Sequence, residues 1–131
     1  MPHIVIDYSA NLDGLVDLQA VVEAARAAAV ETGVFPVGGV RVRTRRCPHV
    51  AIADGDPAHA FVDAILRMGK GRADDVKKRA GDHIFAALSK ALDPAFAKTT
   101  VALSFEINEV DDLNWKRNTI HDALKRRAAE K

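Results

Sequence analysis

The sequence predicts a single-domain α/β (α+β) protein built from a duplicated βαβ unit, with both helices on one face of one sheet. Strand, helix and strand patterns follow one another in residues 2–46, and the same order returns in residues 59–109 at similar spacing. Crossovers between parallel strands are almost always right-handed, so both helices are expected to cover the same face. A loop and helix over residues 110–131 complete the one domain expected for residues 1–131.

The first repeat opens with a strand, a turn and a long helix. PHIVIDYS is rich in β-branched residues, and the ANLDG behind it is a turn signal. From Val16 the run VDLQAVVEAARAAAVETG places apolar residues at helical spacing. Asp17 is the expected N-cap of this helix, and Gly33 is the expected stop. VRVRTRR then alternates like a strand and closes the repeat.

The second repeat follows CPHVAIADGDP, which predicts a short apolar strand and a turn. HAFVDAILRMG predicts a strand, KGRADDVKKRAGDHIFAALSKALD a helix and PAFAK a turn. TTVALSFEINEV alternates apolar and polar residues. Ser104 and Glu106 on its polar side are too polar for a hydrophobic core formed within a single chain. The uncovered face of the sheet therefore favours a symmetric oligomer.

Composition excludes several classes of protein. The chain of 131 residues is 48% hydrophobic and 28% charged, with a formal net charge of +1, which gives no overall electrostatic case for nucleic acid or membrane partners. Cys47 is the one cysteine, so no intrachain disulfide is possible. With no signal peptide pattern and no long apolar run, a cytoplasmic protein is expected. The five histidines show no metal-ligand spacing, so no metal is expected.

Pro2 stands directly behind the initiator methionine, in front of the first strand. Proline is tolerated at the first residue of a strand because it lacks an amide donor, and this is the ordinary explanation. However, methionine in front of a small residue is normally removed. Pro2 would then carry a free secondary amine, which is a candidate base when it lies in an apolar pocket.

Two groups of cations lie at predicted sheet ends, where α/β proteins tend to bind ligands. MGKGRADD is a glycine-rich connection that contains Arg72, and it lacks the trailing Lys-Ser/Thr of a phosphate loop. Arg41 and Arg43 lie in VRVRTRR on one strand face. Each group is also compatible with an ordinary loop or a solvated strand face.

Five stretches together carry a family resemblance: MPHIVIDYS, TGVFPVGGVRVR, ADGDPAHAFVDAILRMGKGR, LSFEINEV and NWKRNTIH. In their order and spacing they resemble the 5-carboxymethyl-2-hydroxymuconate isomerase family. This family belongs to the tautomerase superfamily, with 4-oxalocrotonate tautomerase and macrophage migration inhibitory factor. The resemblance covers essentially the whole chain. It departs from the family at Asp63, where a histidine is expected, and in the strongly basic RTRRCP.

The resemblance implies a cofactor-free isomerase of tautomerase-like fold, with a four-stranded mixed sheet, assembled as a homotrimer. Pro2 would be the catalytic residue, and Arg72 and Arg41 would bind substrate carboxylates, with Arg43 as a further candidate. The implied substrate is a small 2-hydroxy dienoic polycarboxylate from homoprotocatechuate degradation, which is a branch of aromatic catabolism. Its product would be the 2-oxo isomer.

The residues are chemically suited to this reaction. Ketonisation needs a group that takes a proton at one position and returns it at another, most efficiently with a pKa near the working pH. A terminal amine starts at a pKa of about 8, and burial beside cations lowers it further. Arginines bind carboxylates in bidentate fashion and stabilise developing negative charge.

Three alternatives remain open from the sequence. A superfamily relative could run another reaction on a similar acid, and a non-catalytic ligand-binding module could use the same scaffold. A nucleic-acid binder using RVRTRR is opposed by the near-neutral charge and by the absence of interleaved aromatic residues. Trp115 is expected to be a packing anchor rather than a pocket residue.

Overall fold

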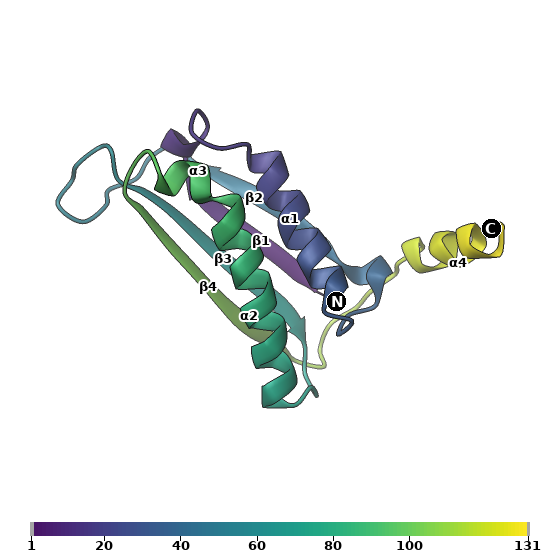
Figure 1. Cartoon of the computed structure of the whole chain (residues 1–131). Coiled ribbons are helices and arrows are strands. Elements are labelled where there is room, and N and C mark those ends of the chain that lie inside the picture. Colours follow the sequence, from purple (N-terminus) through teal and green to yellow (C-terminus); the bar gives the residue numbers. More distant parts are fainter. Residues whose placement is uncertain (1, 131) are drawn as a thin grey trace.

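The computed structural model describes residues 2–130, in which one mixed sheet carries helices on one face (Figure 1). Its strands are β1 (His3–Ser9), β2 (Arg41–Cys47), β3 (Ala60–Gly69) and β4 (Val101–Val110). The α-helices are α1 (Leu18–Glu31), α2 (Asp74–Ala91), α3 (Asp93–Phe96) and α4 (Ile120–Glu130). Two short 3₁₀ turns, η1 (Ala10–Leu12) and η2 (Val37–Gly39), follow β1 and precede β2.

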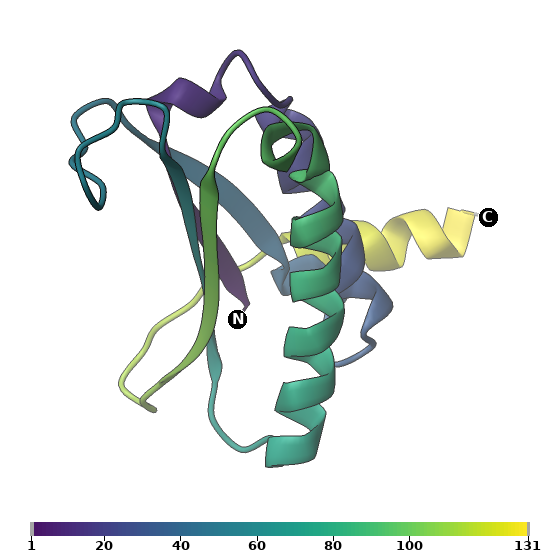
Figure 2. The ribbon, with the colours of Figure 1, turned by 60° about the vertical axis from the view of Figure 1, so that its left-hand side comes forward.

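The sheet order β2-β1-β3-β4 reflects the duplication in the sequence. Within each repeat the two strands are parallel, β1 with β2 and β3 with β4, while β1 and β3 pair antiparallel and join the repeats. Both crossover helices, α1 and α2, lie on the same side of the sheet (Figure 2). The prediction of a four-stranded mixed sheet with two helices on one face is confirmed.

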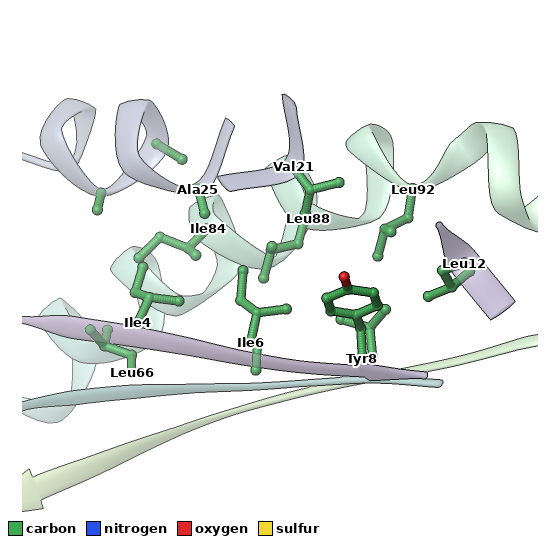
Figure 3. Packing of buried hydrophobic residues seen from close by; sticks show 14 of the residues in the cluster. Ile4, Ile6, Tyr8, Leu12, Val21, Ala25, Leu66, Ile84, Leu88 and Leu92 are labelled. Carbon is green, nitrogen blue, oxygen red and sulfur yellow. The ribbon is translucent and has the colours of Figure 1, made fainter. Parts of the chain in front are cut away.

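The core lies between this helical layer and the inner face of the sheet. Ile4 and Ile6 of β1 and Leu66 of β3 are fully buried against Ile84 and Leu88 of α2. These side chains meet between the two layers (Figure 3). Alternation along the strands decides which residues enter this space, because successive side chains point to opposite faces. The apolar side of β4 follows the same rule and packs at the margin of the core.

Local signals mark the helix ends as expected in α1. The Asp17 carboxylate accepts hydrogen bonds from the amides of Gln19 (3.0 Å) and Ala20 (3.3 Å), as an N-cap does. Gly33 has a φ of +68°, the left-handed conformation that ends many helices and favours glycine.

Two predicted local structures are wrong. Residues 48–59 form a loop without the short strand expected in CPHVAIADGDP, because this segment pairs with none of the four strands and a strand needs a hydrogen-bonded partner. PAFAK begins within the short helix α3 rather than in a simple turn, since Pro94 is compatible with the first turn of a helix.

The outer face of the sheet is not covered by any segment within residues 2–130, and the last helix has no buried side chain. Asp63, Ser104 and Glu106 lie on that outer face, and the Ser104 hydroxyl donates to the Asp63 carboxylate at 2.9 Å. Helix α4 projects from the body (Figure 1) and contains no buried residue. Among residues 2–130, no helix is long and apolar enough to cross a membrane.

Candidate active site

Pro2 is buried at the start of β1 and lines a pocket of about 470 Å³. The carbonyl of Pro2 accepts a hydrogen bond from the amide of Arg41 at 3.2 Å, which fixes the proline at the end of the sheet. The walls come from both repeats and from the C-terminal segment: Phe35, Pro36, Gly39, Met68, Gly69, Lys70, Arg72, Lys116, Asn118 and His121.

Arg72 lies in the same pocket and is held in place by the protein backbone. Its guanidinium donates to the carbonyls of Gly69 and Val34, each at 3.3 Å, and lies 5.3 Å from the centre of the Phe35 ring. These contacts fix the plane of the guanidinium, which has five N–H donors and retains some for a ligand. The structure therefore brings together two of the four residues singled out in the sequence, Pro2 and Arg72.

Arg41 and Arg43 do not line this pocket. In β2 they are cross-strand neighbours of His3 and Val5, on the face of the sheet opposite the helices. The guanidinium of Arg43 lies 3.3 Å from His3 Nδ1. Partial burial, together with the charges of Arg41, Arg67 and Arg43, lowers the pKa of His3 to about 4. Neither arginine lines the pocket of its own chain, so their role as substrate ligands stays a prediction.

The C-terminal segment supplies pocket residues that the sequence reasoning missed. The Asn118 side-chain amide donates to the carbonyl of Gly38 at 2.8 Å, and its Oδ1 accepts from the amide of Ile120 at 2.8 Å. The same amide nitrogen lies 3.3 Å from His121 Nε2. The motif NWKRNTIH was the available signal, but nothing local in it indicates that it returns to Pro2.

Two adjacent glycines make this return possible. A Cβ on Gly39 would lie 3.3 Å from Pro2 Cδ, and a Cβ on Gly38 would lie 2.5 Å from His121 Nδ1. The turn is thus held closely between the Pro2 ring and the His121 ring, with no room for larger side chains. This close packing places the C-terminal segment against the same pocket as the N-terminal proline.

Comparison with known proteins shows the family to which this chain belongs. A family model described as 5-carboxymethyl-2-hydroxymuconate isomerase matches residues 2–124. The chain belongs to this family. It is 31% identical over 126 residues to the 5-carboxymethyl-2-hydroxymuconate Delta-isomerase of Escherichia coli, covering 95% of this chain and all of the relative. The predicted membership and the prediction of an isomerase are confirmed at the level of the family.

Solved structures support the family and the wider fold. A crystal structure of a 5-carboxymethyl-2-hydroxymuconate delta-isomerase is 36% identical, with a TM-score of 0.89, and the match covers 95% of this chain and 93% of that one. A native fused 4-OT is 19% identical, with a TM-score of 0.62, over 94% of this chain and 98% of that one. The second likeness concerns the fold alone and confirms the tautomerase-like architecture.

Other candidate residues lie away from the pocket of Pro2 and Arg72. Cys47 is at the opposite end of β2, where its pairing partner is Ser9. Trp115 is 88% exposed, so the expectation that it anchors the packing of this chain is wrong. Asp63 bonds to Ser104 and does not line the pocket. No cluster of three or more potential metal ligands occurs within residues 2–130.

The larger hollow, of about 610 Å³, lies between α2 and β4 and holds none of the predicted site residues. Its walls include Phe85, Phe105 and an ion pair of 2.9 Å between Lys77 and Glu109. Charges that neutralise each other across a surface groove do not indicate a reactive centre. The pocket of Pro2 and Arg72 is the candidate active site on chemical grounds.

Proposed function

We propose that this protein converts 5-carboxymethyl-2-hydroxymuconate, or a closely similar 2-hydroxy dienoic polycarboxylate, to its 2-oxo isomer by proton transfer through Pro2. The observation that carries the proposal is the burial of Pro2 in one pocket with the backbone-anchored Arg72, in a chain of this isomerase family. The proposal requires Met1 to be removed, and Met1 lies outside the described residues.

The Pro2 nitrogen would act as base and then as acid. It takes the proton from the 2-hydroxyl of the dienol, the C2–O bond becomes a carbonyl, and a proton is delivered to the distal carbon of the diene. A single remaining double bond then lies between the two former ones, so atoms and charge balance without a cofactor. The fixed proline ring holds the nitrogen in one orientation during both transfers.

The surroundings of Pro2 favour the neutral amine that this step needs. A terminal amine has a pKa of about 8. Burial among Met68, Phe35 and Gly39, with the guanidinium of Arg72 in the same pocket, disfavours the protonated form. We therefore expect a substantial neutral fraction at neutral pH.

Arg72 would bind the carboxylate next to the reacting carbon and stabilise negative charge on the 2-oxygen. Charge-assisted hydrogen bonds to a carboxylate are about twice as strong as neutral ones. Because the guanidinium is already oriented by two carbonyls and an aromatic ring, little reorganisation is needed when charge develops.

The proposed assembly is a homotrimer in which the outer face of each sheet meets its neighbours. That face is polar: it carries Arg41, Arg43 and Arg67 around His3, and Ser104 and Glu106 on β4, which do not suit a core within one subunit. In the trimer, Arg41 and Arg43 would serve the pocket of an adjacent subunit. Sedimentation that shows a stable monomer at assay concentrations would contradict this arrangement.

The test of the mechanism is an ultraviolet assay of dienol ketonisation on protein whose mass shows that it begins at Pro2. A variant with one extra residue before Pro2 converts the amine to an amide and should lose at least a hundredfold in rate. Pro2→Ala keeps a terminal amine and should retain weak activity. Equal turnover by the extended and native proteins would place the base elsewhere.

A further inference from the structure

We propose that Lys116 selects substrates with a third carboxylate, an inference that rests on the proposed function of the same pocket. Lys116 belongs to a segment that we call the C-terminal strap, residues 111–121, which joins β4 to the start of α4. In Figure 1 the strap leaves the end of β4 and runs past the start of β1 before α4 begins.

The strap is fixed at both of its ends. At its beginning, Lys70, the residue after β3, forms an ion pair with Asp111, the residue after β4. At its end, Asn118 bonds to the carbonyl of Gly38, and His121 packs directly on that glycine. Lys116 lies between these two attachments, so the strap holds its backbone beside the pocket while its long side chain is exposed.

The charges that line the pocket are unbalanced. Lys70, Arg72 and Lys116 are cationic, and none of the lining residues that the structure describes is acidic. Lys70 forms an ion pair with Asp111, which does not line the pocket. Lys116 pairs with no carboxylate of residues 2–130, and its exposed side chain stands at the solvent side of the pocket.

The two available cations differ in kind and therefore in role. Arg72 is rigid, planar and deep enough to contact Phe35, which suits the carboxylate beside the reacting atoms. Lys116 is a compact charge on a flexible stem, which suits a carboxylate on a side arm of the substrate. A carboxymethyl group on the diene is such an arm, and the same dienol without it leaves Lys116 with nothing to bind.

The experiment compares two dienols, 5-carboxymethyl-2-hydroxymuconate and 2-hydroxymuconate, with native protein, Lys116→Ala, Lys116→Arg and the control Arg117→Ala. Arg117 is the next residue of the strap and does not line the pocket. Lys116→Ala should raise KM for the tricarboxylate about tenfold or more. We expect kcat to change less than threefold, and KM for the dicarboxylate less than twofold. Lys116→Arg should keep most of the preference, and Arg117→Ala all of it.

Three outcomes would overturn the proposal: an equal rise of KM for both dienols, no rise for either, or the same loss in Lys116→Arg as in Lys116→Ala. Failure of the native protein to ketonise either dienol would instead contradict the proposed function. Calorimetric titration with two unreactive probes, tricarballylate and glutarate, then decides about Lys116 separately. Tighter binding of tricarballylate that is lost in Lys116→Ala supports the proposal, and an unchanged ratio overturns it.

Discussion

Gly38→Ala should release the C-terminal helix from the pocket without unfolding the domain. The new Cβ would lie 2.5 Å from His121 Nδ1 and 3.1 Å from both His121 Cε1 and the His121 backbone nitrogen. Turning the imidazole can relieve the 2.5 Å contact, but the 3.1 Å contact with the backbone nitrogen is tighter than most Cβ contacts and needs the start of α4 to shift by a few tenths of an ångström. Helix α4 must therefore move away from η2.

The size of the effect follows from what holds α4 in place. Overpacking a close contact costs about 1–3 kcal/mol. Against this stand one hydrogen bond from Asn118 to Gly38, worth about 1 kcal/mol, and the packing of a helix that has no buried residue. The docking equilibrium of α4 should therefore shift towards the released state by about 5- to 150-fold.

Hydrogen exchange and kinetics measure this release. The amide of Ala123, which donates to the carbonyl of Thr119 at 3.2 Å, should lose protection, while amides of β1 and β3 should not. KM for the proposed substrate should rise, because Lys116 and His121 leave the pocket. Gly14→Ala is the matched control, since its Cβ meets nothing within 4 Å. Unchanged protection at Ala123 and unchanged KM in Gly38→Ala would show that α4 does not depend on its contact with Gly38.

Three further predictions concern other parts of the molecule. Arg72→Ala should lower kcat/KM at least tenfold while the chain stays folded, because the arginine lies in a glycine-rich turn outside the core; unchanged kinetics would remove it from the site. The pKa of His3 is about 4 in the folded chain and 6.5 in the unfolded one, so the unfolded chain takes up this proton first. The free energy of unfolding should thus fall as pH drops through this interval, by about 1 kcal/mol after solvent screening. His3→Gln should reduce that slope in urea titrations, and an identical slope would contradict the assignment. Alkylation of Cys47 should leave ketonisation intact, because the mechanism uses no thiolate. Inactivation that substrate prevents would instead place Cys47 near the substrate pocket.

Local sequence patterns were enough to predict the order and type of the main elements. Alternation in TTVALSFEINEV, helical spacing behind Asp17 and the stop at Gly33 each depend on neighbours within a few residues. Pro2 and Arg72 were candidates from their own sequence settings, the family resemblance assigned them roles, and the fold places both in one pocket. The short strand expected in CPHVAIADGDP failed because a strand needs a partner edge, which no local pattern specifies.

Long-range contacts in the folded chain determine which distant residues share the pocket with Pro2. Asn118 and His121 reach it through contacts with Gly38, some 80 residues earlier in the chain, and Lys116 is carried there between them. The path of this strap depends on a few individual contacts rather than on periodic burial, so composition and spacing did not reveal it. Strand pairing likewise places Arg41 on the face of the sheet opposite the helices, because the register fixes the face on which each side chain lies.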